Sequence, residues 1–256
     1  MPKVYSLFPL PMEPTEPVKN KIVVVIDVIR ASTTIAAAFA RGYKYIVPIS
    51  DIDAAFQLRE KLDAILAGEK DGIKVPGFDF SNSPYEILNS PRKRDILILR
   101  TTNGVRAISY VKGKGNLITT CGLVNISSVA ELVSILAKET KKDILVLAVG
   151  RKGIRGIEDE FCAGLLVDKL RQKNYELSSE SYRLIEIAKK CDIEKCVLRS
   201  SWASELLKIE KNRLNDLKLA SKIDYFTAQP LLTRIELNGI PLEAFIDHHK
   251  NETKIS

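Results

Sequence analysis

Short apolar runs alternate with amphipathic segments along most of this chain, and this alternation constrains its fold most strongly. Residues 21–27 (KIVVVID) form a continuous apolar run rich in β-branched residues, which is typical of a strand buried on both faces of a parallel sheet. The alanine-rich segment after it indicates a helix that Ser32 or Thr33 caps at its start and Gly42 closes at its end. Together they predict one strand–helix unit of an α/β fold.

Further units of the same kind follow along the chain. Asp51 and Asn125 stand where the N-caps of two expected helices belong. Strands that alternate with helices in this way predict a three-layer α/β/α fold with a mostly parallel central sheet. The expected strands are 45–49, 95–100, 116–120 and 143–150, and the expected helices are 52–66, 105–111, 126–139 and one that begins near Glu158.

The pattern changes near residue 171. Lys/Glu-rich helical stretches follow, and residues 225–245 have strand and turn character. Because no low-complexity linker separates the two parts, we expect residues 1–256 to form one domain, with a core at 20–170 and a helical and strand elaboration at 171–256. A stretch at 67–94, rich in Gly, Pro, Asn and Ser, interrupts the alternation, and a loop of that length in a compact domain is usually functional.

The cysteines and histidines offer few groups for metal or nucleophilic chemistry. The four cysteines are expected to be reduced thiols, and the C-x4-C spacing of Cys191 and Cys196 is not a usual zinc spacing. His248 and His249 are the only histidines and lie in a polar tail at 248–256, which argues against a zinc site or a histidine-based triad. The chemistry is therefore expected to depend on carboxylates and a hard metal ion.

The charge pattern favours a small anionic ligand over nucleic acid. The net charge is +7 and the pI is near 9.1. Most lysines alternate with acidic residues, as in ELLKIEKNRLNDLKLASK, which is typical of solvated helix faces. No apolar run is long enough to span a bilayer and no secretory signal is evident, so we expect a cytoplasmic protein with no membrane partner.

Polar residues gather after the expected strands, where the carboxyl ends of parallel strands form the usual ligand-binding edge of an α/β sheet. The carboxylates there are Asp27, Glu158 and Asp159, and the long stretch adds Glu69. Arg30 follows Asp27 closely, and Arg100 and Arg106 lie near the third strand end. The candidate phosphate ligands are Ser32, Thr33, Asn82, Thr101, Thr102, Asn103, Gly104, Arg151 and Arg155.

This mixture suits a phosphorylated ligand bound together with Mg²⁺. Backbone N–H groups at helix N-termini bind phosphate oxygens, arginine clamps an oxyanion through two hydrogen bonds, and carboxylates hold Mg²⁺. Each residue also has a structural explanation, since Arg30 can pair with Asp27, residues 101–104 make a good turn, and Glu158 and Asp159 complement a helix dipole. Their joint placement at strand ends favours the functional interpretation.

Several families of phosphate-binding or hydrolytic enzymes are excluded by their missing motifs. No GxxxxGK[ST] occurs, so the chain is not expected to be a P-loop NTPase. The residue two positions after Asp27 is Ile29, which does not fit the Asp-x-Asp of haloacid-dehalogenase-type phosphatases. No GxGxxG follows the first strand, and no G-x-S-x-G elbow is present.

The chain resembles the 2-phosphosulfolactate phosphatase family in four separated motifs that occur in order. The resemblance covers residues 22 to about 170 and continues more weakly over 224–241. Four motifs in order are more specific than any one of them. The motifs are IDVIRASTT at 26–34, LAGEKDGIKVPGFDFSNSP at 66–84, TTNGVRAI at 101–108 and IEDEFCAG at 157–164.

The resemblance implies a Mg²⁺-dependent phosphatase with a three-layer α/β fold peculiar to that family. It implies conversion of 2-phospho-3-sulfolactate to 3-sulfolactate and phosphate, a step toward coenzyme M. We expect Asp27, Glu69 and either Glu158 or Asp159 to hold Mg²⁺. Arg30 and the amides of residues 102–104 are expected to stabilise the transferring phosphoryl group. Asp27 or Asp159 would act as base for the attacking water, and a covalent aspartyl-phosphate on Asp27 is the alternative.

Two other functions remain open at this stage. One is a phosphatase that acts on another small phosphorylated acid, and the other is a non-catalytic anion-binding protein. In each case the partner is a small anionic molecule. A homodimer is the default expectation for an α/β enzyme of this size.

Overall fold

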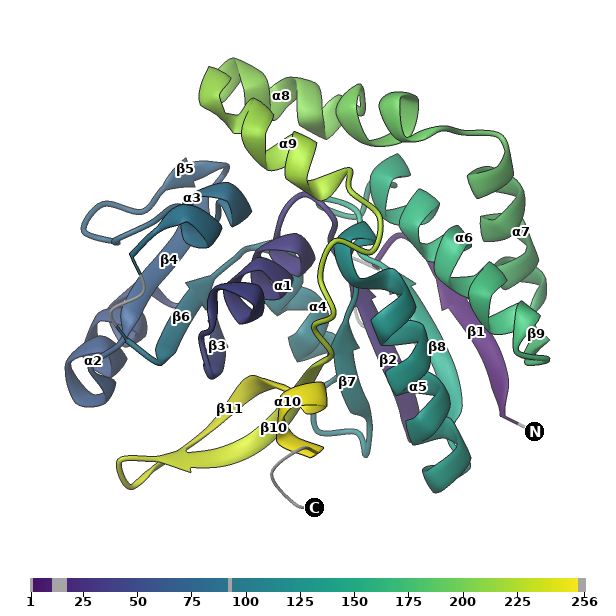
Figure 1. Cartoon of the computed structure of the whole chain (residues 1–256), viewed down its shortest axis with the longest axis horizontal. Helices are drawn as coiled ribbons and strands as arrows, with labels where there is room; N and C mark the ends of the chain where they lie inside the picture. Colours follow the sequence, from purple (N-terminus) through teal and green to yellow (C-terminus); the bar gives the residue numbers. More distant parts are fainter. Residues whose placement is uncertain (1, 11–17, 92–93, 253–256) are drawn as a thin grey trace.

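A computed structural model describes residues 2–10, 18–91 and 94–252 of the chain. Helices cover both faces of one large sheet, as Figure 1 shows. This arrangement confirms the predicted three-layer α/β/α fold. Within these residues, no helix is long and apolar enough to cross a membrane.

The described part of the sheet has eleven strands in the order β5-β4-β6-β3-β11-β10-β7-β2-β8-β1-β9. Most neighbouring pairs on either side of the C-terminal hairpin are parallel, whereas β10–β11, β10–β7, β11–β3 and β4–β5 are antiparallel. The mostly parallel sheet is therefore confirmed. The strands are β1 Lys3–Leu7, β2 Lys21–Ile26, β3 Tyr45–Ile49, β4 Ile65–Lys70, β5 Ile73–Lys74, β6 Ile96–Arg100, β7 Leu117–Thr120, β8 Asp143–Ala148, β9 Glu176–Leu177, β10 Pro230–Leu237 and β11 Ile240–Asp247.

Strand β2 lies between β7 and β8 and is buried on both faces. Val23 and Val25 pack with Val111 of α4 on one face, whereas Val24 and Ile26 pack in the cluster that α5 and α6 complete on the other. Because both faces need apolar side chains, the strand is a continuous apolar run rather than an alternating one.

The helices are distributed over both faces of the sheet. Helices α5 and α6 cover one face of β2 and β8, and α1 and α2 pack in separate clusters on β3, β4 and β6. Figure 1 shows α8 and α9 crossing one edge of the sheet, above α1 and α6. The helices are α1 Ala31–Arg41, α2 Ile52–Leu62, α3 Pro84–Asn89, α4 Asn103–Val111, η1 Leu123–Asn125, α5 Ile126–Thr140, α6 Ile157–Gln172, α7 Ser179–Lys189, η2 Glu194–Leu198, α8 Ser201–Ile209, η3 Lys211–Arg213, α9 Leu214–Ala220 and α10 His248–Glu252.

Two predicted N-caps of helix α1 are wrong. The helix begins at Ala31, so Ser32 and Thr33 lie inside it and are buried. Their hydroxyls bond to neighbouring strands and loops instead of to the helix start. Gly42 closes the helix in the left-handed conformation with φ 103°, as predicted.

The other two predicted caps occupy the expected positions. The Asp51 carboxylate accepts a hydrogen bond from the Ala54 N–H at 2.7 Å and caps α2. Asn125 stands at the N-cap of α5, but its Oδ1 accepts a hydrogen bond from the Gly122 N–H at 2.9 Å. Asn125 therefore stabilises the turn before the helix rather than the helix itself.

The helix predicted at 52–66 and the loop predicted at 67–94 are both too long. Helix α2 ends at Leu62 because Asp63 adopts a left-handed conformation with φ 49°, and the chain then forms β4. Strand β4 pairs in parallel with β6, so Glu69 lies in a strand and not in a loop. The rest of this segment contains β5 and α3, and residues 92–93 lie outside the described residues.

The central sheet extends beyond residues 20–170 at both ends. The C-terminal hairpin β10–β11 inserts between β3 and β7, where Leu231 pairs with Thr119 and Phe245 pairs with Ile46. Strand β1, which the sequence did not predict, pairs in parallel with β8. The predicted polar tail begins with the short helix α10, and residues 253–256 lie outside the described residues.

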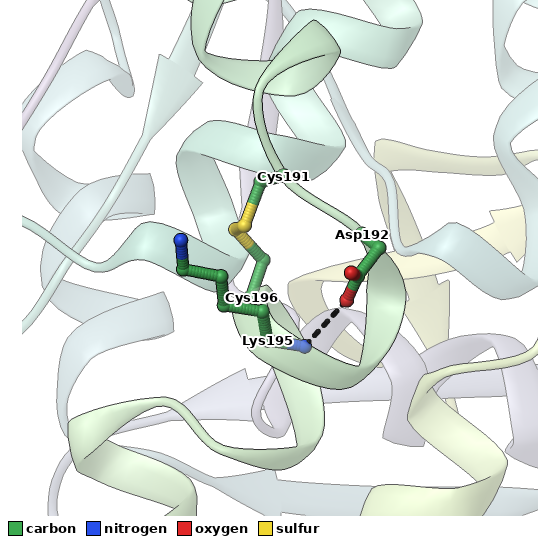
Figure 2. Close-up of a disulfide and its surroundings, with 4 residues drawn as sticks. All are labelled: Cys191, Asp192, Lys195 and Cys196. Atoms are coloured by element: carbon green, nitrogen blue, oxygen red, sulfur yellow. Dashed lines mark hydrogen bonds between the residues drawn. A yellow bond between two sulfur atoms is a disulfide. The ribbon is translucent and has the colours of Figure 1, made fainter.

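Cys191 and Cys196 form a disulfide between α7 and α8, as Figure 2 shows. This corrects the expectation that all four cysteines are reduced. The turn between the two cysteines brings their Cα atoms to 6.0 Å, within the range that a disulfide spans. In the same turn the Lys195 N–H donates to Asp192 Oδ1 at 2.7 Å. Cys121 and Cys162 are free and buried.

Candidate active site

Four parallel strands, β2, β4, β6 and β8, end at one edge of the sheet, and polar loops follow them there. The loops enclose a cavity of about 30 Å³, to which helix α8 adds one side chain. The lining residues are Asp27, Ile29, Arg30, Glu69, Asp71, Gly72, Asn82, Thr101, Thr102, Asn103, Arg151, Lys152 and Trp202. Much of the predicted site is therefore gathered in one place, although its members come from five separate segments.

Asp27 follows β2 directly and lies at the N-terminus of α1. It is 8% exposed, and its Oδ1 accepts a hydrogen bond from the Ala31 N–H at 3.4 Å. Burial raises the pKa of Asp27 to about 6; the Ala31 N–H opposes this shift, and the negative charge of Glu69 adds to it. A carboxyl group with such a pKa exchanges its proton near neutral pH, which suits a general base.

Glu69 joins two of the loops that form the cavity. Its Oε1 accepts hydrogen bonds from the Thr102 amide and hydroxyl, and its Oε2 accepts one from the Gly72 N–H at 2.7 Å. Its backbone carbonyl accepts a hydrogen bond from Arg100. Oε1 already accepts two hydrogen bonds, but within the described residues Oε2 accepts only one and keeps a lone pair that a cation can use.

Gly104 lets the backbone of the third loop approach Asp27 closely. A Cβ at this position would lie 3.0 Å from Thr101 Oγ1 and 3.4 Å from Asp27 Oδ2. The Gly104 N–H donates to Thr101 Oγ1 at 3.1 Å, and the Thr102 N–H donates to Glu69. These two amides already have acceptors within the protein, and their binding of the phosphoryl group stays a prediction. Asn103 stays a predicted phosphate ligand.

Arg30 enters the cavity from the loop between β2 and α1 and is 3% exposed. Its Nη1 donates to Asp216 Oδ2 at 3.2 Å and its Nη2 donates to the Gly72 carbonyl at 3.3 Å. The ion-pair partner is thus on helix α9, whereas the sequence offered Asp27. The peptide bond between Ile29 and Arg30 is cis. A buried guanidinium on a cavity wall is suited to clamp an oxyanion.

Asp27, Glu69 and Asn82 form the part of the cavity that fits Mg²⁺. Asn82 is 4% exposed, and within the described residues its buried Oδ1 has no hydrogen-bond partner. Mg²⁺ in proteins usually takes oxygen ligands from one or two carboxylates and completes its shell with water and substrate phosphate. Two carboxylates and one unpaired amide oxygen in a single cavity match that preference.

The four carboxylates predicted to hold the metal do not meet at one point. Within the described ranges, no group of three or more Asp, Glu, His or Cys side chains is placed to hold a metal ion. Asp159 lies outside the cavity lining, and its two oxygens accept hydrogen bonds from the Val28 N–H at 2.7 Å and the Gly150 N–H at 2.9 Å. Burial raises the pKa of Asp159 well above its ordinary value, and Glu158 and Asp27 add to this shift. Asp159 therefore joins the loops after β2 and β8 and stabilises the site without lining its cavity.

Glu158 and Arg155 line a neighbouring cavity of about 350 Å³. Burial raises the pKa of Glu158 to about 7, the Ser200 hydroxyl opposes the shift, and Asp27 adds to it. Arg155 forms an ion pair with Glu160 through two hydrogen bonds of 2.5 and 2.6 Å. Its charge is therefore paired with a carboxylate of the protein, as those of Arg151 and Lys152 are, and its role at the phosphate stays a prediction.

Ser32 and Thr33 lie below the cavity rather than in its lining. The Asp27 N–H donates to Ser32 Oγ at 3.0 Å, and Ser32 Oγ lies 2.6 Å from Thr120 Oγ1. The Thr33 hydroxyl donates to the Val28 carbonyl at 2.8 Å. Both hydroxyls fix the loop that carries Asp27 and Arg30, and their role as phosphate ligands stays a prediction.

Trp202 of α8 is a cavity residue that the sequence analysis missed. Its Nε1 donates to the Ile29 carbonyl at 2.9 Å, and the Arg151 guanidinium stacks over its ring at 3.6 Å. Arg151 also donates to Glu205 at 2.5 Å. As the single tryptophan of the chain, Trp202 was a visible signal, but nothing local in the sequence connects it with a loop about 170 residues earlier.

Asp71, Gly72 and Lys152 were also missed. They belong to turns beside β5 and after β8, and Lys152 Nζ lies 3.5 Å from Asp71 Oδ1 across the cavity mouth. Arg151, Lys152 and Trp202 line both cavities. The small cavity at the strand ends is therefore flanked by a larger one with the same cationic residues between them.

Comparison with known proteins is consistent with this site. The sequence profile of the 2-phosphosulpholactate phosphatase family matches residues 10–234. The chain belongs to this family. The match includes the loops after β2, β4, β6 and β8 and also helices α8 and α9, which bring Trp202 and Asp216 to the cavity.

Individual relatives of the 2-phosphosulpholactate phosphatase family align over most of the chain. A protein of Carboxydothermus hydrogenoformans is 35% identical over 214 residues, which is 83% of this chain and 86% of the relative. A protein of Pseudothermotoga lettingae is 33% identical over 217 residues, 84% of this chain and 92% of the relative. A protein of Thermotoga maritima is 28% identical over 229 residues, which is 90% of this chain and 95% of the relative. Each is named a probable 2-phosphosulfolactate phosphatase.

Proposed function

We propose that this protein is a phosphatase that hydrolyses 2-phospho-3-sulfolactate to 3-sulfolactate and inorganic phosphate. The observation that carries the proposal is the small cavity that Asp27 and the buried Arg30 both line. Such a site combines a base with an anion clamp, as phosphate-ester hydrolysis requires. Membership of the 2-phosphosulpholactate phosphatase family and the names of the relatives support the same activity.

The charges around the site support a substrate with more than one anionic group. 2-Phospho-3-sulfolactate carries a phosphate, a carboxylate and a sulfonate. Arg30 lies in the small cavity, and Arg151 and Lys152 lie between it and the larger one. We propose that the phosphate binds in the small cavity and that the rest of the substrate extends toward the larger one.

Mg²⁺ is part of the proposal. Asp27, Glu69 and Asn82 would hold it, because their oxygens share one cavity and the Asn82 oxygen has no partner in the described part of the chain. When bound, the ion would offset the negative charge of the phosphoryl oxygens.

In the proposed reaction, Arg30 binds the phosphoryl oxygens and Asp27 accepts a proton from the attacking water. The water oxygen forms a bond to phosphorus while the ester P–O bond breaks. The bonding pair leaves with the substrate oxygen, which takes a proton from solvent. Asp27 is preferred to Asp159 as the base because Asp27 lines the cavity, whereas both oxygens of Asp159 accept backbone hydrogen bonds.

Attack by Asp27 on phosphorus is the alternative mechanism. Acid quenching of a single turnover separates the two. Direct water attack predicts that Asp27 is never phosphorylated and that ¹⁸O from labelled water appears in the phosphate. A phosphorylated Asp27 peptide would contradict direct attack.

A phosphate-release assay tests the proposed function. Phosphosulfolactate, phospholactate, phosphoglycolate and p-nitrophenyl phosphate are compared, first with Mg²⁺ and then with EDTA. We expect the highest kcat/KM for phosphosulfolactate and loss of turnover in EDTA. A higher value for another phospho-acid would assign the site to that substrate and remove the proposed role on the way to coenzyme M. No turnover of any compound would leave only an anion-binding protein.

A further inference from the structure

Arg30 is held by a residue that lies far from it in the sequence. Its Nη1 donates to Asp216 Oδ2 at 3.2 Å, and both side chains are 1% exposed. Asp216 belongs to α9, in the C-terminal region that the sequence analysis left without a role. Figure 1 shows this helix lying across the sheet edge near α1, the helix that Arg30 precedes.

The second oxygen of Asp216 is bonded as well. Oδ1 accepts hydrogen bonds from the Ser83 hydroxyl at 2.5 Å and from the Tyr85 N–H at 3.2 Å. Ser83 precedes α3 and Asn82 precedes Ser83, so the carboxylate is anchored to the segment that carries the unpaired Asn82 oxygen. Both sides of the Asp216 carboxylate are therefore fixed, and it can hold the guanidinium in one orientation.

A fixed guanidinium is what phosphoryl binding needs. A free arginine side chain loses conformational entropy when it is ordered, and the ligand has to supply that free energy unless the protein has already done so. The hydrogen bonds to Asp216 and to the Gly72 carbonyl use two of the five N–H groups of Arg30. Within residues 2–10, 18–91 and 94–252 the other three have no acceptor, so they are open to the oxygens of a bound phosphoryl group.

We infer that Asp216 is a positioning residue that orients Arg30 for the phosphoryl group, which makes the C-terminal helix α9 part of the active site. The inference rests on the proposed function, since it assigns Arg30 to phosphate. It gives Asp216 no contact with substrate, because Asp216 is absent from the cavity lining.

A second ion pair at the same junction provides the control, and its arginine, Arg213, also lies 3.8 Å from Asp216 Oδ2. Arg213 donates to Glu86 Oε1 at 2.7 Å and is 4% exposed, so it also joins the α9 region to α3. Glu86 has no hydrogen bond to Arg30 in the described part of the chain. If Asp216 only held α9 in place, removing the charge of Asp216 or that of Glu86 would weaken phosphate binding to a similar degree.

The test compares Asp216→Asn with Glu86→Gln in the full-length protein. In Asp216→Asn one carboxylate oxygen becomes an NH2 group, so either Arg30 or the Ser83–Tyr85 segment loses its acceptor, and in both cases the guanidinium loses its charged partner. We expect kcat/KM for phosphosulfolactate to fall about tenfold to hundredfold, mostly through KM, and the Kd for inorganic phosphate to rise about tenfold. Glu86→Gln is expected to change kcat/KM and the Kd for phosphate by less than about threefold. Each of the two variants is expected to lower the thermal stability.

The binding measurement separates this inference from the proposed function. If wild type binds inorganic phosphate but hydrolyses none of the esters, the proposed function fails and the Kd comparison still tests Asp216. Equal Kd values for the two variants, or a wild type that does not bind phosphate, would overturn the inference. If Asp216→Asn does not fold, Ser83→Ala removes the hydroxyl that orients Asp216 and keeps the charge. It should raise the Kd for phosphate by a smaller factor, and an unchanged Kd would again overturn the inference.

Discussion

Glu69 Oε1 accepts hydrogen bonds from both the amide and the hydroxyl of Thr102, each at 3.2 Å. This contact joins the carboxyl end of β4 to the start of α4. Through its other oxygen, Glu69 also holds the Gly72 N–H. One carboxylate therefore shapes two walls of the cavity and is also available to a cation.

Glu69→Gln tests the role of that charge. The amide keeps an oxygen for Thr102 but loses the negative charge, so we expect the Mg²⁺ concentration for half-maximal activity to rise by about tenfold or more. A Mg²⁺ titration of phosphate release measures this. Thr102→Val is the control, because it removes the hydroxyl's bonds to Glu69 and Arg100 but keeps the Glu69 charge, and it should shift the titration much less. Identical titrations for wild type and Glu69→Gln would exclude Glu69 from the metal site.

Asp159→Ala is expected to reduce stability rather than to affect chemistry directly. The change leaves the buried N–H groups of Val28 and Gly150 without their acceptor, and each such loss costs about 1–3 kcal/mol. Urea unfolding in the presence of EDTA measures the free energy of unfolding of each variant. Asp168→Ala on the same helix removes surface contacts with Arg171 and Gln172 and should cost about 0.5 kcal/mol or less. Equal losses for the two variants would contradict the role given to Asp159.

Asp27→Asn is expected to stabilise the folded protein at high pH in the absence of metal. The pKa of Asp27 is raised from 3.8 to about 6, so the folded state binds the proton more tightly than the unfolded state does. Wild type therefore loses stability as the pH rises from about 4 to about 6, by about 3 kcal/mol, and the Asn variant does not lose this contribution. Urea unfolding at pH 8 and at pH 4.5, both in EDTA, should show the variant's advantage at pH 8 and a smaller one at pH 4.5. If the variant is less stable than wild type at pH 8, the ionised Asp27 carboxylate does not destabilise the folded state, and the prediction is wrong.

The Cys191–Cys196 disulfide is expected to affect stability and not activity. It closes a short loop, for which the chain-entropy relation gives about 2 kcal/mol. The bond lies outside the cavity lining, so Cys191→Ser should lower the free energy of unfolding by about that amount and leave kcat unchanged. Thiol titration of the unfolded chain provides the check. Without reductant we expect only Cys121 and Cys162 to react, and a reaction of all four cysteines would show that the bond is absent.

The parts of the fold that local pattern determines were predicted well. The apolar runs of β2, β3, β6, β7 and β8 are long enough to be recognised, and Gly42 and Asp51 act at the helix ends where expected. The loops after β2 and β6 were assigned to the site because parallel strands place their carboxyl ends at one edge. That argument needs only the order of the elements along the chain.

What the sequence could not predict depends on contacts between distant segments. The hairpin β10–β11 inserts between β3 and β7, and nothing in its own residues indicates that position. Asp159 is a carboxylate near the end of β8, as a metal ligand would be, but its two oxygens accept hydrogen bonds from backbone amides. Arg30 finds its partner 186 positions later in Asp216. These outcomes are decided by packing, which single-sequence periodicity does not report.

The most direct test of the account measures phosphate release from phosphosulfolactate with Mg²⁺ for wild type, Asp27→Asn and Arg30→Ala, each shown to be folded by its unfolding transition. The account predicts turnover by wild type and a loss of at least about a hundredfold in kcat/KM for both variants. Variants that are folded and keep wild-type kcat/KM would contradict the placement of the active site at the Asp27–Arg30 cavity.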